Sequence, residues 1–202
     1  MAKQFTANMK MADKPEYEMI SFKTAKELEK WLAKNHAASK GIWLRLFKKE
    51  SGEKSVTYNE ALDEMLCYGW IDGQIKKYDD RSWIRKFTPR GSKSIWSKKN
   101  TDHIERLTKL DKMKASGLSE VEKAKADGRW LKAYDSPIEM KMPEDFIKLL
   151  SKNKTAKTFF ESLNKANKYA IGWRLQTAKK PETREKRMKM ILEMMDKGKK
   201  FH

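Results

Sequence analysis

Hydrophobic positions after residue 20 recur first at helical spacing and then at strand spacing. Residues 24–35 carry one apolar stripe, as a helix does; residues 42–47 alternate between two faces, as a strand does; and residues 57–69 return to helical spacing. The capping boxes Thr24–Glu27 and Thr57–Glu60 begin the two helices, because a Thr hydroxyl and a Glu carboxylate can each satisfy a free backbone amide there. We therefore expect a helix, a strand and a second helix.

Two more strand patterns follow this second helix. They cover residues 70–78 and 81–87 and are joined by the polar pair Asp79 and Asp80, which suits a tight turn. The pattern predicts an antiparallel hairpin. Gly73 would weaken the first strand unless it marks a β-bulge or a close approach to the backbone.

Beyond Gly91 only helical spacing remains. Asn100, Thr101 or Asp102 can cap the next helix, which should stop near Gly117. The helices expected after it cover residues 119–128, a segment that begins at Pro143, and residues 155–163, 166–179 and 181–197. The predicted fold class is α+β: a small antiparallel sheet with packed helices, followed by a helical C-terminal part.

The 202 residues suggest three regions. Residues 1–20 form a flexible N-terminal lead, residues 21–136 an α+β region, and residues 137–202 a helical C-terminal domain. Mean hydropathy is low, at -0.89, but seven Trp, eight Phe and twelve Met supply core material. The chain is therefore long and apolar enough to bury a core without disulfides or metal.

Cys67 is the only cysteine, which excludes an internal disulfide and indicates a reducing compartment. The N-terminal residues contain no apolar run long enough for the core of a signal peptide, and eighteen apolar residues never occur together. We predict a cytoplasmic protein without a transmembrane segment. No pattern in the chain predicts an oligomeric state.

The net charge of +18 is concentrated in two stretches. Residues 74–99 carry nine Lys or Arg against two Asp, and residues 141–202 carry seventeen against seven Asp or Glu. Such a field attracts nucleic acid, anionic lipid or an acidic partner. Because most of the excess is Lys, a solubilising surface is the simpler explanation.

The candidate ligand site lies in residues 67–100, where aromatic and polar residues are most densely mixed. Its members are Trp70, Asp72, Gln74, Arg85, Thr88, Arg90, Ser94, Trp96, Ser97 and Asn100. Trp70, Asp72 and Gln74 would share one strand face. Loop hydroxyls, Arg90 and the amides of the following helix could bind a phosphate or carboxylate. We expect a pocket for a small anionic ligand between the hairpin and the Trp96 loop, with Arg90 and Asn100 near its surface.

Structural roles for the same residues stay open. Asp72 could simply pair with Arg85 or Arg90, the tryptophans could be core, and Ser97 and Asn100 could only cap the helix.

A second, alternative site involves Arg184 and Arg187, one turn apart on the last helix. They could bind the backbone of nucleic acid, or they could form a solvated face with pairs to Glu182 or Glu185.

The sequence shows no clear signature of an enzyme. The histidines His36, His103 and His202 show no metal-ligand spacing, and no phosphate loop or nucleophile elbow occurs. Cys67 should be an inert packed thiol. We therefore predict no catalytic residue, no metal and no cofactor. An unrecognised enzyme centred on Asp72, with His103 as its acid–base partner if the fold brings the two together, is an alternative.

The motifs GWIDGQ, FTPR and SIWSKKN, followed by GLSEVEKAKADGRW and AKKPETREKRMKMIL, occur in a familiar order and spacing. With them the chain resembles the YdeI/OmpD-associated family, also called the bacteriocin-protection family, over nearly everything after residue 15. The resemblance implies an OmdA-type helical domain over residues 137–198. It also implies a link to tolerance of bacteriocins, cationic peptides or stress, and to an outer-membrane porin.

The leading hypothesis is a non-enzymatic cytoplasmic binding protein of this family with an anion pocket. The alternative is a basic, nucleic-acid-associated protein.

Overall fold

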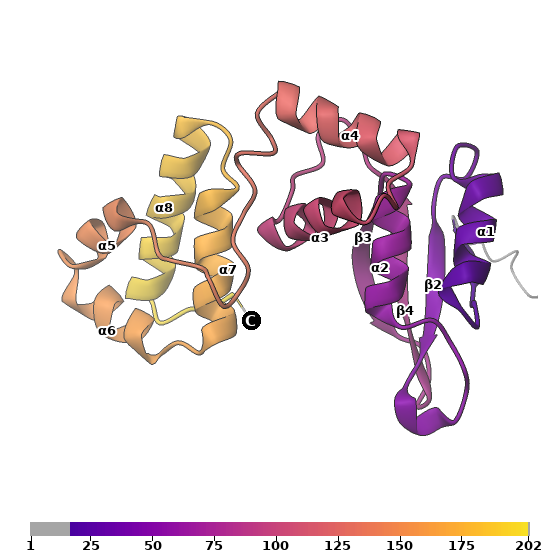
Figure 1. Cartoon of the computed structure of the whole chain (residues 1–202). Coiled ribbons are helices and arrows are strands. Elements are labelled where there is room, and N and C mark those ends of the chain that lie inside the picture. The colour runs from indigo at the N-terminus through magenta and orange to yellow at the C-terminus, as the bar shows by residue number, and fades with distance from the viewer. Residues whose placement is uncertain (1–16, 202) are drawn as a thin grey trace, which may run out of the picture. The chain divides into compact units, whose positions relative to one another are not determined.

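The computed structural model describes residues 17–201, which form two compact units (Figure 1). Within the described residues, the sheet unit contains residues 17–91 and 112–120, and the helical unit contains residues 92–111 and 121–201. The chain therefore passes between the units three times, and helix α4, Ala115–Ala126, contributes to both.

A four-stranded sheet forms the centre of the sheet unit. Its strands are β1, Glu18–Ile20; β2, Ile42–Phe47; β3, Trp70–Lys77; and β4, Ser82–Pro89. The strand order is β1-β2-β4-β3, with β1 parallel to β2 and the other neighbours antiparallel. The α+β class is thus confirmed, but the sheet is mixed rather than antiparallel. The reason is that the end of the predicted lead forms β1; residues 1–16 of that lead lie outside the described residues.

The predicted hairpin is present as β3 and β4. Trp70 lies opposite Pro89 and Lys77 lies opposite Trp83, so the two strands pair along their length. The register shifts between Asp72 and Ile75, which places a bulge at Gly73 as the sequence predicts. The regular alternation of side chains is therefore interrupted inside β3.

Helices α1, Ala25–Asn35, and α2, Tyr58–Cys67, begin at threonine caps. Thr57 and Glu60 form the full capping box, with both reciprocal hydrogen bonds. Thr24 Oγ1 accepts from the Glu27 amide at 3.2 Å, but the Glu27 carboxylate accepts from the Lys23 amide instead of that of Thr24. Only half of the first predicted box is therefore formed.

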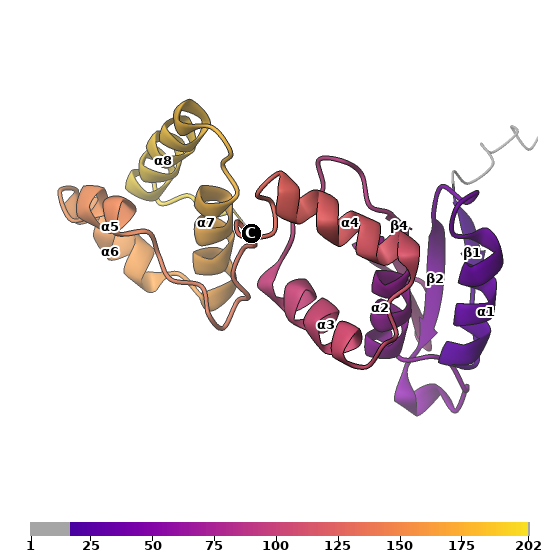
Figure 2. The same cartoon turned by 45° about the horizontal axis from the view of Figure 1, so that its top comes forward.

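Both helices lie on one face of the sheet (Figures 1 and 2). The alternation along β2 explains this packing, because every second residue of the strand is buried and the intervening residues are half-buried. The buried aliphatic residues are Leu28, Leu32, Ile42, Leu44, Leu46, Leu62, Met65 and Leu66, with Trp70 and Phe87 among them.

The start of α4 closes over the end of α2. The Lys114 amide donates to the Cys67 carbonyl at 3.1 Å, and Gly117 lies against that same carbonyl. A Cβ on Gly117 would come within 2.8 Å of the Cys67 carbonyl carbon and closer still to its oxygen. Only glycine permits this approach.

The helical unit begins with a loop and α3, Lys98–Lys109, followed after the shared helix α4 by four more helices. These are α5, Glu144–Leu150; α6, Lys154–Ser162; α7, Lys165–Gln176; and α8, Pro181–Asp196. The last three agree with the predicted helices. The prediction of a helix from about residue 100 to Gly117 is wrong at both ends. The observed helix α3 starts after its N-cap, Ser97. It stops at Lys109, because Asp111 takes a left-handed conformation with φ of 54°.

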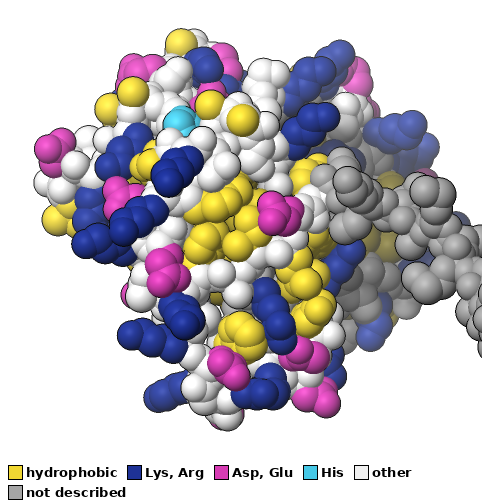
Figure 3. Space-filling view, turned by 90° about the vertical axis from the view of Figure 1, so that its right-hand side faces the viewer, with side chains coloured by type: hydrophobic (Ala, Val, Ile, Leu, Met, Phe, Trp, Pro, Cys, Tyr) yellow, Lys and Arg dark blue, Asp and Glu magenta, His cyan; other side chains and the backbone are white. Residues whose placement is uncertain are grey.

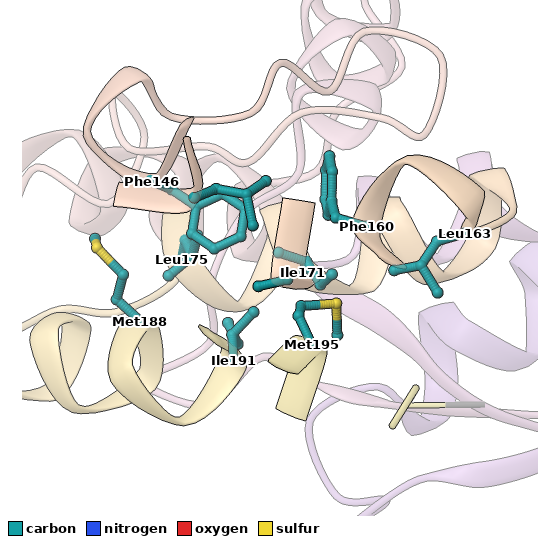
Figure 4. Close-up of a cluster of buried hydrophobic side chains, with 10 residues drawn as sticks. Phe146, Phe160, Leu163, Ile171, Leu175, Met188, Ile191 and Met195 are labelled. Atoms are coloured by element: carbon teal, nitrogen blue, oxygen red, sulfur yellow. The ribbon is translucent and has the colours of Figure 1, made fainter. Parts of the chain in front are cut away.

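The core of the helical unit is a cluster from α5 to α8 and the turn between α6 and α7 (Figure 4). It contains Phe146, Leu150, Ala156, Phe160, Leu163, Ile171, Leu175, Met188, Ile191 and Met195. The Phe146 and Phe160 rings meet edge to face, with centroids 5.7 Å apart. This region therefore has a hydrophobic core of its own.

Candidate functional site

In the sheet unit, the predicted site residues Asp72 and Arg85 form a part-buried ion pair. Asp72 Oδ2 accepts hydrogen bonds from Arg85 Nη2 and, at 2.8 Å, from the Tyr58 hydroxyl at the start of α2. The guanidinium also lies over the Tyr58 ring, 5.0 Å from its centroid. The side chains of Arg85 and Asp72 are only 21% and 14% exposed. This network joins α2 to both strands of the hairpin.

The predicted ligand face of Trp70, Asp72 and Gln74 does not extend along β3. Trp70 is 1% exposed, and its Nε1 donates to the His36 carbonyl at 3.3 Å. Gln74 is exposed and lies in the bulge, after which Ile75 takes the place opposite Arg85. The bulge therefore removes Gln74 from this face.

Arg90 and Asn100, which were expected near a loop surface, are both buried at 7% exposure. The Arg90 amide donates to the Gly69 carbonyl at 3.0 Å, which holds the end of β4. Thr88 is half-buried beside Gly41. These residues therefore contribute to packing in the sheet unit and in α3.

In the helical unit, the predicted loop residues hold the start of α3. Ser97 is the N-cap, and its hydroxyl accepts from the Asn100 amide at 3.2 Å. Trp96 is 2% exposed and packs against Trp130, with ring centroids 5.0 Å apart. The Ser94 carbonyl accepts from Arg129. The structure thus supplies structural partners for this group; a pocket that joins it to the hairpin stays a prediction.

The alternative polyanion residues are also engaged in contacts within the helical unit. Both terminal nitrogens of Arg184 bind the Asp145 carboxylate, which lowers the pKa of Asp145. Arg187 donates to the Arg174 carbonyl at 2.7 Å. Arg184 therefore pairs across to α5 rather than along its own helix to Glu182 or Glu185. Nucleic-acid binding by these residues stays a prediction.

A cavity of about 390 Å³ in the helical unit gathers cations around the loop that begins at Ser92. Lys93, Arg129, Lys132 and Lys179 line it, against a single acid, Asp127. Ser92, Ile95, Gln176, Thr177 and Ala178 complete the lining. None of the ten predicted site residues is among them.

Arg129 is the fixed cation of this cavity. Its side chain is 11% exposed, and its Nε donates to Asp127 at 2.6 Å while its Nη1 donates to the Ser94 carbonyl at 2.9 Å. The hydrogen bond from Arg129 holds the pKa of Asp127 below its usual range, so the acid stays ionised and paired. Asp127 thus offsets one cation and leaves three lysines.

Sequence reasoning missed these residues because they come from three distant segments. Of the four cations, only Lys93 lies inside the predicted region 67–100. The available signal was Asp127-Gly128-Arg129, a turn in which Gly128 has φ of 76° and the acid bonds the arginine two residues on. The motif ending in ADGRW contains this turn.

Cys67 does not offer a nucleophile. It is 2% exposed, and its burial raises the pKa of the thiol to about 12. Within residues 17–201, no three His, Cys, Asp or Glu side chains gather in a group able to hold a metal ion. Among the same residues, no helix combines the length and apolar character needed to cross a membrane.

The surface of the sheet unit shows no single basic patch on the face toward which α1 lies. Figure 3 shows hydrophobic side chains near the middle of this face, with Lys and Arg side chains scattered among Asp and Glu around them. On this face, the Lys and Arg side chains are therefore mixed with acids rather than gathered into one basic patch.

We expect Asp72→Ala to lower the free energy of unfolding by about 2 kcal/mol, because it leaves the part-buried Arg85 without its acid. Arg85 Nε already lacks a hydrogen-bond partner within the described residues. The double variant Asp72→Ala/Arg85→Met should recover most of the loss, since both charges are then removed. Urea unfolding followed by circular dichroism measures both. An Asp72→Ala variant as stable as the wild type would contradict the structural role and favour a ligand role.

The fold and the site define a basic α+β protein with a cation-rich cavity in its helical unit. The family model described as "Bacteriocin-protection, YdeI or OmpD-Associated" matches residues 139–198, and one described as "Domain of unknown function (DUF8412)" matches residues 20–120. The chain therefore belongs to the DUF8412 family, whose model matches half of its residues, and the match over residues 139–198 supports the YdeI/OmpD-associated family that the motifs predict. No curated protein and no solved structure matches the chain.

Proposed function

We propose that this protein binds a small anion, a carboxylate or a phosphate, in the cavity lined by Lys93, Arg129, Lys132 and Lys179. The observation that carries the proposal is the excess of four cations over one acid in a cavity of about 390 Å³. That volume lies within the range of small-molecule sites. Like charges held together in a confined space favour an anion that neutralises them.

The lysines are suited to this role because none of the three forms an ion pair with a carboxylate of the described residues. Within residues 17–201, neither Lys93 nor Lys132 forms an ion pair, and the Lys179 ammonium donates only to the Lys93 carbonyl, at 3.3 Å. Charge-assisted hydrogen bonds from such groups are stronger than neutral ones. The lining contains no histidine and no cysteine, so the cavity suits binding rather than acid–base or thiol chemistry.

The test compares a cavity variant with a matched control of equal charge. Lys132→Gln/Lys179→Gln should weaken the binding of phosphate or succinate at least about tenfold, since each lost charge-assisted contact is worth about 1.5–3 kcal/mol. Lys186→Gln/Lys200→Gln removes two exposed lysines elsewhere in the same unit and should change the Kd by less than about twofold. Titration calorimetry at constant ionic strength measures both. Absence of binding to the wild type, or equal weakening in the two variants, overturns the proposal.

A role in bacteriocin tolerance, drawn from the family description, forms part of the proposal. A cation-rich cavity repels cationic peptides, so protection would depend on the bound anion rather than on direct capture of the peptide. We place this role in the cytoplasm, on the basis of the single reduced cysteine. Survival of bacteria producing the wild type or the cavity variant under bacteriocin challenge tests it: equal survival rejects the role while leaving anion binding intact.

A further inference from the structure

The helical unit contains a larger cavity, about 850 Å³ in volume, lined by the segment 137–142 and by α7. Eight of its eleven lining residues are apolar, the other three are Lys165, Lys168 and Arg174, and none is acidic. It shares no lining residue with the cation-rich cavity, so an inference about it does not depend on the proposed function. The volume is that of a small-molecule site.

The apolar wall packs closely on α7 at Gly172. A Cβ on Gly172 would come within 2.6 Å of Met142 Cε and 2.7 Å of Met140 Sδ, so the two methionine side chains lie directly against the helix at this residue. Ile138, on the same lining, is 97% exposed. Methionine side chains adapt to the shape of an apolar partner. The wall is therefore suited to a flexible hydrocarbon chain.

Two of the three cations of this cavity bond to neutral groups. Lys168 Nζ donates to the Glu161 carbonyl at 2.9 Å, and Arg174 Nη1 donates to the Ala170 carbonyl at 3.1 Å. The Arg174 guanidinium also lies 3.9 Å from the centroid of the Phe201 ring. Within residues 17–201, no carboxylate pairs with Lys165, Lys168 or Arg174. The positive charge thus stays available to a ligand.

We propose that this cavity binds a small amphipathic anion, an aliphatic carboxylate. Its chain would cover Met140, Met142 and Trp173, and its carboxylate would meet the cations of α7. A neutral hydrocarbon would leave these cations without an anionic partner. A short anion would leave the apolar side chains of the wall exposed to water. An aliphatic ammonium ion would be repelled.

The test uses octanoate as the probe and the methionine methyl groups as the local readout. Octanoate should shift the Met140 and Met142 methyl resonances saturably, whereas propionate, 1-octanol and octyltrimethylammonium should bind at least about tenfold more weakly. Assignment comes from Met140→Leu and Met142→Leu. Because all four probes meet the same folded protein, the comparison does not depend on the stability of any variant.

Two variants then locate the site. Ala166→Phe, at an exposed lining position, should fill the cavity and abolish the shift of the methionine methyl resonances. Lys165→Glu/Lys168→Glu should weaken the binding of octanoate at least about tenfold. Lys186→Glu is the charge control and should bind as the wild type does. Equal binding of 1-octanol or octyltrimethylammonium, an unsaturable shift, or unchanged binding to Ala166→Phe overturns the proposal. So does a preference for anionic vesicles or an acidic peptide with no saturable binding of octanoate.

Discussion

Replacing Phe146 with Ala should lower the free energy of unfolding of the helical unit by about 4 kcal/mol, the largest loss that we expect from a single truncation in this region. Phe146 is fully buried in the cluster of α5 to α8, and its ring packs against that of Phe160. The variant loses the transfer free energy of the ring and leaves a cavity behind. Denaturant unfolding measures the loss, and hydrogen exchange of the α7 and α8 amides assigns it to this unit.

The matched control lies one residue further on in α5. Ile147 is 42% exposed, so Ile147→Ala should cost less than about 1 kcal/mol in the same helix. Similar losses for the two variants would show that Phe146 is not the centre of this core.

Replacing Gly117 with Val should destabilise the sheet unit by about 3 kcal/mol, because the new side chain would overlap the Cys67 carbonyl. Helix propensity acts in the opposite direction, since Gly is less favourable than Val inside a helix by about 0.5 kcal/mol. The steric cost is larger, so the sign of the effect is set by packing. Thermal unfolding measures the loss.

Ser119→Val is the control for this variant. Ser119 is exposed two residues further along α4, where a valine meets no such neighbour, and the substitution should change stability by less than about 0.5 kcal/mol. A stable Gly117→Val protein would mean that α4 does not lie against the end of α2. Faster reaction of Cys67 with a thiol reagent in Gly117→Val would support the contact, because the buried thiol would become accessible.

The parts of the fold that follow from local chemistry could be predicted from the sequence. The box at Thr57 and Glu60, the turn at Asp79 and Asp80, and the bulge at Gly73 each depend on a few neighbouring residues. The start of α3 was misplaced because Ser97, Asn100 and Thr101 are all good caps, and local pattern does not choose among them. Strand β1 was missed because three residues show no clear alternation.

The candidate site could be predicted less well than the fold. The mixture of aromatic and polar residues in 67–100 marks residues that join elements of the fold, such as Asp72 with Arg85 and Ser97 with α3. A polar residue that joins two buried elements and one that binds a ligand look alike in a sequence, because both depend on partners distant along the chain. The cation-rich cavity could not be predicted for the same reason, because Lys93, Arg129 and Lys179 are far apart in the sequence and meet only in the folded chain.

The sheet unit is built from two stretches of sequence that residues 92–111 separate, and this affects how it folds during synthesis. Residues 17–91 leave the ribosome first, but the Cys67 carbonyl gains the Lys114 amide as its partner only after residues 112–120 have been made. By then residues 92–111, which belong to the helical unit, have already been made. The first unit therefore cannot be completed before synthesis of the second has begun, unlike a chain whose domains follow one another. A nascent chain that had emerged from the ribosome only as far as residue 91 would carry the four strands with the end of α2 still uncovered.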